Sequence, residues 1–319
     1  MNEKTGRLML EVRGLNKRFG QVHAVNNLNF EVRRGEVFGF LGPNGAGKST
    51  TMRIITCFIP PTSGSVLVDG MDTAEQDLAV RRRIGYLPES TPLYSDMTVR
   101  EYLAFVGQVR SLRGEKLKAR MDEMFSVCAL TAMADRQIGK LSKGYRQRVG
   151  LAQAMIHDPD LLILDEPMSG LDPNQIIEIR NLIKKFGEEK TVIYCSHILS
   201  EVSATCDRIL IIKDGRIVAT GTPDDLTSGH KGGSRYTLRI KGDKEPIKST
   251  FSSMGGVSGI DIESAQEGWF NARINTEIKD DIGELIFNRV VQNGWALSEL
   301  RRDQTSLEEV FTELTGGRQ

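Results

Sequence analysis

The sequence predicts an α/β fold, a mixed sheet flanked by helices, and three observations lead to this prediction. Short apolar or alternating runs recur along the first part of the chain, as the strands of a buried sheet do. One such run, 37–41, passes directly into a glycine-rich loop, and another, 161–164, ends in two adjacent carboxylates. A strand, a loop and a helix in succession are the unit from which helix-covered sheets are built.

The expected strands share this apolar or alternating pattern. They lie at 8–12, 28–32, 37–41, 65–68, 83–87, 161–164, 191–195 and 208–212. At about 92–157 the pattern becomes helical, which predicts a helical subdomain inserted into the core. Its helical segments are 99–109, 115–130 and 143–155. A further helix is expected after Asp172, which can cap it, with Pro173 in its first turn.

Residues 229–234 are small, polar and rich in glycine, which is linker composition. We therefore expect a main domain at 1–228 and an accessory domain at 235–319. The order strand, helix, strand, strand, helix, strand in the second region predicts a ferredoxin-like α+β domain. Trp269 and Trp295 are expected to pack its small core. Since no residue there suggests chemistry, its expected role is dimer support or regulation.

Charge and cysteine content exclude several classes of protein. Among 319 residues, Lys plus Arg number 42 and Asp plus Glu number 42, so there is no global basic field and no nucleic-acid partner is expected. The four cysteines are scattered and too sparse for a disulfide framework, which favours a reducing cytosol. No run approaches the roughly 18–20 apolar residues of a membrane span, so any membrane role is expected to come through a partner.

The glycine-rich loop predicts a triphosphate site. It reads Gly42, Pro43, Asn44, Gly45, Ala46, Gly47, Lys48, Ser49 and Thr50. The glycines let backbone N–H groups converge on phosphate oxygens, Lys48 reaches the β and γ phosphates, and the Ser49 hydroxyl can ligate Mg²⁺. A chance match to this pattern arises in on the order of one chain in a hundred of this length. The flanking strand and helix signals favour the functional interpretation.

Polar side chains at the ends of two other strands complete the predicted chemistry. Asp165 would hold Mg²⁺, and Glu166, pointing the other way along the strand, would orient or deprotonate the attacking water. His197, after the strand at 191–195, is expected to bond the γ-phosphate. Each feature alone is compatible with an ordinary strand exit or a structural histidine. Together with the loop, they predict an ATPase that converts ATP and water to ADP and phosphate.

A second anion site is predicted at 141–144, Leu-Ser-Lys-Gly. Ser142 can cap the following helix, so its hydroxyl and the Gly144 N–H would face outward at a positive helix end. This stretch, with the motifs above, resembles the signature of ATP-binding cassette (ABC) proteins across about 8–225. The resemblance implies a head-to-tail dimer in which Ser142, Lys143 and Gly144 close over the ATP held by Lys48 of a second copy.

The same resemblance implies three further roles. Phe19 would stack on adenine, although core packing at a strand end is the alternative. An interface loop would cross between the copies; it comprises Ser169, Gly170, Leu171 and Asp172. His197 would be the switch histidine. Many family members carry glutamine where this chain has Glu89, so whether Glu89 ligates Mg²⁺ stays open.

Glu89, Lys143, Tyr145 and the tail at 306–311 are similar to the branch that pairs with ABC-2 type export permeases, including gliding-motility-associated and multidrug export subunits. This similarity implies a peripheral protein on the cytoplasmic face of the cell membrane, bound to an integral permease. Residues 86–105 are candidates for the docking surface or for plain helix packing; they include Tyr94, Met97 and Tyr102.

Two other functions remain open from the sequence. The first is a soluble ABC ATPase acting on ribosomes or DNA, although the second cassette, coiled coils or cysteine-rich insertions usual in such proteins are missing from this sequence. The second is a nucleotide sensor without turnover, against which Lys48, Asp165, Glu166 and His197 argue.

Overall fold

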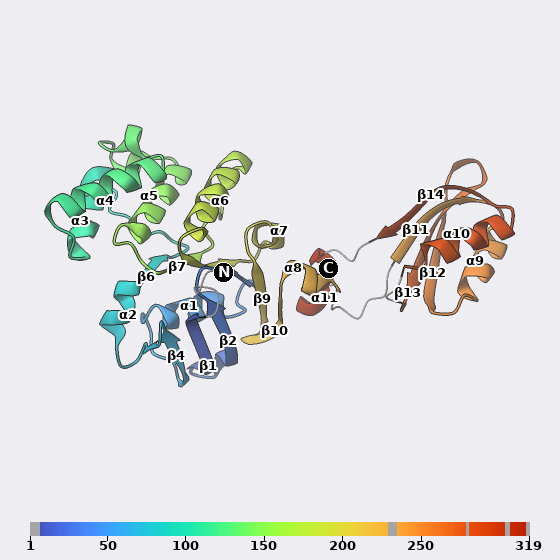
Figure 1. Cartoon of the computed structure of the whole chain (residues 1–319), viewed down its shortest axis with the longest axis horizontal. Coiled ribbons are helices and arrows are strands. Elements are labelled where there is room, and N and C mark those ends of the chain that lie inside the picture. The colour runs from blue at the N-terminus through green and yellow to red at the C-terminus, as the bar shows by residue number, and fades with distance from the viewer. Residues whose placement is uncertain (1–6, 229–234, 279–280, 304–306, 317–319) are drawn as a thin grey trace. The chain divides into compact units, whose positions relative to one another are not determined.

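The computed structural model describes residues 7–228, 235–278, 281–303 and 307–316. The chain forms two compact units, Met1–Pro223 and Asp224–Gln319, and each is described by itself (Figure 1). The division falls slightly before the expected end of the first domain at 228. The expected linker at 229–234 lies outside the described residues.

The first unit contains two sheets rather than the single mixed sheet predicted. One has the strand order β2-β1-β4-β5, formed by β1 (Leu8–Phe19), β2 (Val22–Arg33), β4 (Ser63–Val68) and β5 (Met71–Asp72). All its pairings are antiparallel. β1 and β2 extend well past the predicted 8–12 and 28–32, because half-exposed polar residues continue the pairing with several register shifts where no apolar run marks a strand.

The other sheet has the order β10-β9-β3-β8-β7-β6. Its strands are β3 (Val37–Leu41), β6 (Ile84–Leu87), β7 (Leu161–Asp165), β8 (Thr191–Ser196), β9 (Arg208–Lys213) and β10 (Arg216–Gly221). All neighbours are parallel except β9 and β10, so this sheet is mixed as predicted. Register pairs Leu41 with Ser196 and Asp165 with Cys195, which brings the ends of β3, β7 and β8 to one edge.

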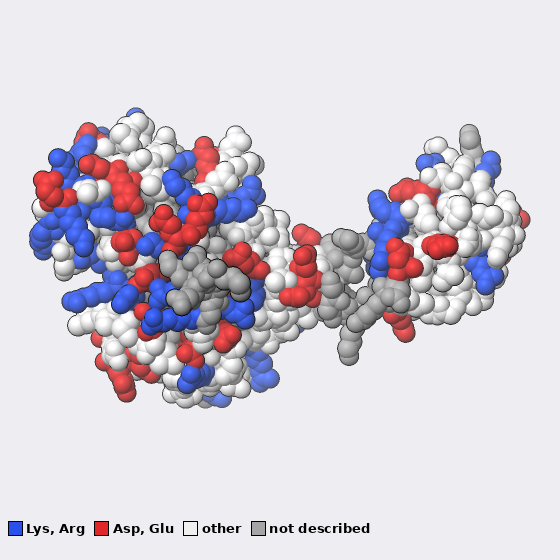
Figure 2. All heavy atoms as spheres, in the orientation of Figure 1, with Lys and Arg blue, Asp and Glu red and all other residues white. Residues whose placement is uncertain are grey.

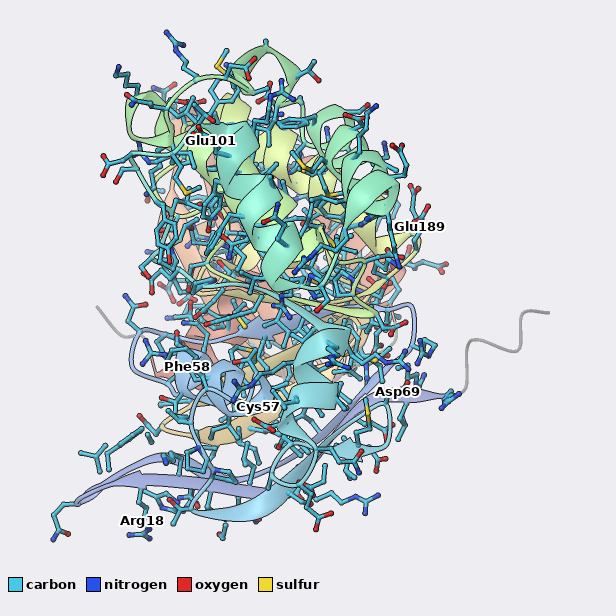
Figure 3. All side chains as sticks on the ribbon, turned by 90° about the vertical axis from the view of Figure 1, so that its left-hand side faces the viewer. Arg18, Cys57, Phe58, Asp69, Glu101 and Glu189 are labelled. Carbon is cyan, nitrogen blue, oxygen red and sulfur yellow. The ribbon has the colours of Figure 1, made fainter. Side chains whose placement is uncertain are left out.

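Helices follow the strands and fill the predicted helical region. They are α1 (Lys48–Ile55), α2 (Asp77–Arg83), α3 (Val99–Val109), α4 (Gly114–Val127), α5 (Lys143–Met155), α6 (Pro173–Gly187) and α7 (Leu199–Ser203). The helices α3, α4 and α5 come between β6 and β7 in the sequence, and they lie together in the structure (Figure 1). α4 stops short of the predicted 130 because Ala129 adopts a left-handed backbone, φ 52°. Thr98 and Glu101 cap α3 with reciprocal bonds, and Glu101 is labelled in Figure 3.

The two sheets share a core and an ion-pair network. The ring of Phe30 on β2 stacks on that of Phe38 on β3, with the centroids 6.0 Å apart. Asp69 (Figure 3), beyond β4, pairs with Arg34 at 2.7 Å, and Arg34 also reaches Asp160 before β7 at 3.4 Å. These contacts join the antiparallel sheet to the mixed one.

The division falls at the first residue of α8 (Pro223–Ser228), and the second unit then adopts the predicted ferredoxin-like order. It continues with β11 (Arg235–Lys241), α9 (Lys244–Ser252), β12 (Val257–Ser264), β13 (Trp269–Thr276), α10 (Gly283–Gln292), β14 (Ala296–Asp303) and α11 (Leu307–Thr315). Its antiparallel sheet has the order β12-β13-β11-β14. Trp295 packs against Phe251 in the core, as predicted, with the ring centroids 6.1 Å apart. Trp269 does not: it lies outside that cluster, with the Arg239 guanidinium 5.7 Å from its ring centroid.

Over the described ranges, none of the helices has the length and apolar character needed to span a bilayer. On the face drawn in Figure 2, acidic and basic side chains are interspersed over the first unit. This mixture agrees with the balanced charge of the sequence.

Candidate functional site

The glycine-rich loop joins β3 to α1 and is fixed by its surroundings. A β-carbon on Gly42 would lie 2.4 Å from the Ile212 carbonyl oxygen, and one on Gly47 would lie 2.5 Å from that of Ala24. Gly47 also has φ 104°, a conformation that side chains disfavour. Both positions therefore require glycine, and neighbouring strands set the path of the loop.

Lys48 lies inside this loop. It is only 6% exposed, and its Nζ donates to the carbonyl oxygens of Gly42 at 2.7 Å and Pro43 at 3.3 Å. The same ammonium lies 3.5 Å from Oε1 of Glu166. The cation is thus placed by carbonyls and one carboxylate at the point where a triphosphate would enter.

Asp165 ends β7 and is 2% exposed, with one carboxylate oxygen, Oδ1, lacking any hydrogen-bond partner among the described residues. Burial raises the pKa of this carboxyl, a bond from Ser49 lowers it, and the negative charges of Glu166 and Glu89 raise it further. An orphaned, buried carboxylate oxygen beside a serine hydroxyl fits a divalent cation. In the described part of the chain, no group of three or more His, Cys, Asp or Glu side chains could hold a metal ion.

Glu166 is placed differently from the prediction. β7 ends at Asp165, and Glu166 has a left-handed backbone, φ 51°, with its N–H donating to the Cys195 carbonyl at 3.0 Å. Strand alternation therefore does not set its direction. Its Oε2 lies 2.9 Å from Nδ1 of His197, while Oε1 faces Lys48. The structure thus brings together three of the residues predicted for catalysis and phosphate binding.

These side chains border a cavity of about 490 Å³. The described residues lining it are Ala24, Asn44, Gly45, Gly47, Lys48, Ser49, Thr50, Glu89, Glu166, Ser169 and His197. Most of these residues were predicted from the sequence. Ala24 was not, because the sequence of β2 does not indicate that Ala24 faces the glycine-rich loop. Of the remaining loop residues, Ala46 is buried and Pro43 half-buried. The cavity is of the size and polarity that suit a phosphate chain.

Phe19, at the end of β1, is 50% exposed, so the core-packing alternative is wrong. The ammonium of Lys17 lies 5.1 Å from its ring centroid. Phe19 does not border the cavity at Lys48. An exposed ring beside a cation stays a suitable stacking surface for an adenine.

The signature segment, 141–144, behaves in part as predicted. Ser142 is exposed and caps α5 by accepting from the Tyr145 N–H at 3.4 Å. The residue Gly144 is buried, because the Gln175 side chain covers the flank on which a β-carbon would lie. Lys143 is exposed, and its ammonium lies over Gly170 of the interface loop.

The interface loop, Ser169 to Asp172, turns between β7 and α6. The Ser169 N–H donates to the Glu166 carbonyl at 3.1 Å, and the Leu171 N–H to that of Met168 at 3.3 Å. Gly170 has φ 65° and is exposed. Asp172 caps α6 by accepting from Asn174 and Gln175, as predicted.

Comparison with known proteins identifies this arrangement. Residues 25–169 match the family model described as "ABC transporter". The linearmycin resistance ATP-binding protein LnrL of Bacillus subtilis (strain 168) is 33% identical over 97% of this chain and 98% of its own length, so the similarity includes both units.

Two solved structures are similar to the first unit. CbiO1 from Clostridium perfringens, titled as part of the ABC transporter complex cbiONQ, is 30% identical with a TM-score of 0.63, covering 69% of this chain and 90% of its own. The dimeric cassette MJ0796 bound to ADP and Pi is 28% identical with a TM-score of 0.62, covering 67% and 98%. ABC ATPase domains dimerise and pair with membrane components. The chain belongs to the ABC transporter ATP-binding family and is an ATP-binding ATPase.

Proposed function

We propose that this chain is the ATPase subunit of an exporter, acting as a head-to-tail dimer bound to a separate ABC-2 type permease at the cytoplasmic face of the membrane. The observation that carries the proposal is the placement of Glu166 between Lys48 and His197 in one cavity. LnrL, which aligns with nearly all of the chain, is named for resistance to linearmycin, and export is one route to resistance. The ribosome or DNA alternative gains no support from these relatives.

In this mechanism the loop N–H groups and the positive end of α1 bind the phosphates. Lys48 exchanges its loop carbonyls for β- and γ-phosphate oxygens. Ser49 and Asp165 would hold Mg²⁺, which supplies charge neutralisation on the phosphates when bound. Glu166 orients the attacking water and accepts its proton, while His197 holds that carboxylate and reaches the γ-phosphate.

A second copy would complete the site. Ser142, Lys143 and Gly144 of one protomer are proposed to close over the ATP of the other, with Phe19 on the adenine. The interface loop would then lie between the two sites. Closing and reopening this ATP sandwich is the proposed power stroke for transport.

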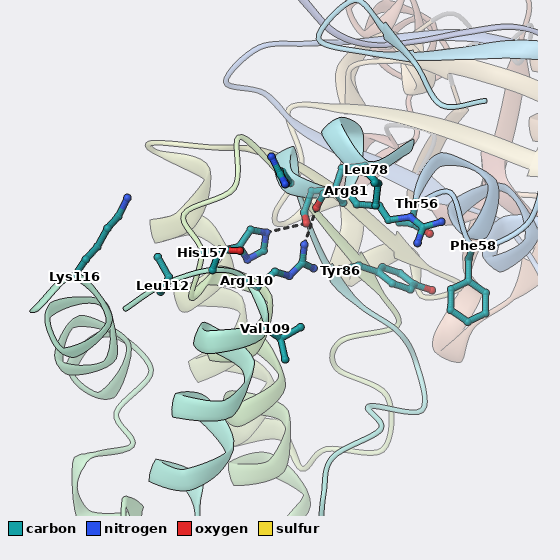
Figure 4. A pocket seen from close by; sticks show the side chains of 13 residues that line it. Thr56, Phe58, Leu78, Arg81, Tyr86, Val109, Arg110, Leu112, Lys116 and His157 are labelled. Carbon is teal, nitrogen blue, oxygen red and sulfur yellow. Dashed lines mark hydrogen bonds between the residues drawn. The ribbon is translucent and has the colours of Figure 1, made fainter. Parts of the chain in front are cut away.

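A groove of about 840 Å³ is the proposed docking surface for the permease. It lies between α2 and β6 on one side and the ends of α3 and α4 on the other (Figure 4). Exposed apolar side chains border it, namely Phe58 at 75%, Leu78 at 68% and Val109 at 65%. Its cations are Arg81, Arg82, Arg110 and Lys116, and none of the described residues lining it is acidic. A cytoplasmic permease helix with one apolar and one acidic face would fit this groove.

The docking candidates from the sequence agree only in part with this surface. Tyr86 lines the groove. Tyr94 is 57% exposed and packs its ring on that of Phe105, centroids 5.7 Å apart. Tyr102 is 4% exposed and donates to Gln153, so it packs within the helical region and is not a docking residue.

Purification of the tagged full-length chain from detergent-solubilised native membranes tests this proposal. We expect a multi-span membrane protein to accompany the wild type in stoichiometric amount. Arg82→Glu, which reverses one groove charge, should release it, while the matched reversal Arg18→Glu, outside the groove, should not. Recovery of the wild type with ribosomes or DNA, and without a membrane protein, would contradict the proposed function.

A further inference from the structure

The first turn of α5 and the segment that begins α6 meet through two glycines. A β-carbon on Gly144 would lie 2.6 Å from both Cδ and Oε1 of Gln175. A β-carbon on Gly170 would lie 2.3 Å from Nζ of Lys143. Each glycine therefore receives a side chain from the other segment, in space that any larger residue would fill.

The contact continues along both helices. One turn beyond Gly144, Arg148 forms an ion pair with Glu178, which lies one turn beyond Gln175. Arg148 also donates to the Cys128 carbonyl at 3.2 Å, which ties the pair to the end of α4. α6 itself is anchored on its buried face by Ile179, Leu182, Ile183 and Phe186. The start of α5 is thus held by a helix that is fixed to the core of the unit.

The direction of this contact leaves the Gly144 amide available. In the first turn of a helix, N–H groups point beyond the N-terminus and have no partner within the helix, whereas the β-carbon direction is sideways. Gln175 occupies the sideways direction. Within the described residues, no hydrogen bond from the Gly144 N–H occurs outside the helix. Gln175 therefore packs on the flank of Gly144 without using its donor.

We infer that Gln175 is a positioning residue, whose side-chain amide braces the signature glycine from within its own protomer. This inference rests on the proposed sandwich dimer. With the brace in place, the Ser142 hydroxyl and the Gly144 N–H keep one fixed geometry toward the ATP of a second copy. Glycine at position 144 then leaves room for the amide of Gln175 within the same protomer, because a larger residue would collide with it.

ATP-driven dimerisation of the full chain tests the brace. In a Glu166→Gln background, which should hold the dimer closed, light scattering gives the ATP concentration for half-maximal dimer. Gln175→Ala should raise this concentration about tenfold, a loss of preorganisation of about 1.4 kcal/mol. Gln175→Met, which fills the same space, should stay within about twofold of the parent, because packing rather than hydrogen bonding makes the contact. An equal effect of Ala and Met, or none from Ala, would overturn the inference.

A pair of substitutions distinguishes a collision with Gln175 of the same protomer from a collision with the ATP of the second copy. Gly144→Ala should weaken dimerisation more than Gln175→Ala does, and adding Gln175→Ser should restore it to about the level of Gln175→Ala, because the new methyl group then no longer collides with Gln175. If the double variant remains as defective as the single one, the methyl group acts on the ATP in trans and the brace is wrong. Failure of the Glu166→Gln parent to dimerise would instead overturn the proposed sandwich and this role with it.

Discussion

At the scale of single residues, the chemistry is concentrated on three side chains that come from different strand ends. Lys48 follows β3, Glu166 follows β7 and His197 follows β8. Their contacts at 3.5 Å and 2.9 Å place Glu166 between Lys48 and His197, which makes it the proposed link between phosphate binding and proton transfer. The roles proposed for this group depend on the distances between them rather than on any one motif.

Glu89 adds a third carboxylate near Asp165, and its charge contributes to the raised pKa of Asp165. Asp165 must be ionised to hold a cation, so its pKa limits activity on the acid side. Glu89→Gln removes one of the negative charges that raise the pKa of Asp165. The acid limb of ATP hydrolysis should therefore move to lower pH with activity retained. ATPase rates measured across the acid range check this. An acid limb that stays in place, or a complete loss of hydrolysis, would show that Glu89 acts in another way.

Substitution of Phe19 is predicted to weaken ATP binding without changing the stability of the fold. Its ring is 50% exposed, so Phe19→Ala removes little buried area. Loss of stacking should raise the KM for ATP by about three- to tenfold, with kcat and melting temperature nearly unchanged. Phe19→Tyr is the matched control, since it keeps the ring. An unchanged KM in the alanine variant would exclude contact with the base.

The positions of several candidate site residues were predictable from the sequence because their motifs are local. The glycine-rich loop and His197 follow strands, and Asp165 ends one, and the apolar pattern of each strand is visible in the sequence. The direction of Glu166 was not predictable, since it depends on a left-handed backbone and a bond to the neighbouring strand. The contact of Gln175 with Gly144 was not predictable either, because the two residues lie on different helices and are distant in the sequence.

At the scale of elements, α6 connects the interface loop to the core, and its cap is a testable feature. Asp172 accepts two backbone N–H bonds at the helix start. Asp172→Ala should destabilise the fold by about 1 kcal/mol, or lower the melting temperature by about 2–4 °C, whereas Asp172→Asn keeps an accepting oxygen and should be nearly neutral. Equal loss in both variants would mean that the charge, rather than the cap, matters.

Elements with a strong apolar period were predicted well, and those without one were missed. The limits of α3, α5 and β3 agree with the sequence prediction. α2 buries only Val80, and β10 alternates between exposed and half-buried residues, so neither leaves a clear apolar signal. The division into two sheets also escaped prediction, because strand pairing depends on contacts distant in sequence.

At the scale of the whole molecule, the two units call for separate tests. The first unit contains the cavity and both candidate halves of the ATP sandwich. We propose that the second unit supports or regulates the dimer. Removing residues after 228 should leave a folded ATPase whose hydrolysis or dimerisation differs from that of the full chain. Both quantities unchanged, at matched protein and ATP concentrations, would exclude either role.

The most direct measurement of the central claim compares ATP turnover and molar mass of the full-length chain with and without Glu166→Gln. The account predicts that the variant hydrolyses ATP roughly a hundred- to ten-thousandfold more slowly and that it accumulates as an ATP-dependent dimer, because the carboxylate beside Lys48 and His197 accepts the proton of the attacking water. Equal hydrolysis rates for the two proteins, with no ATP-dependent dimer, would contradict it.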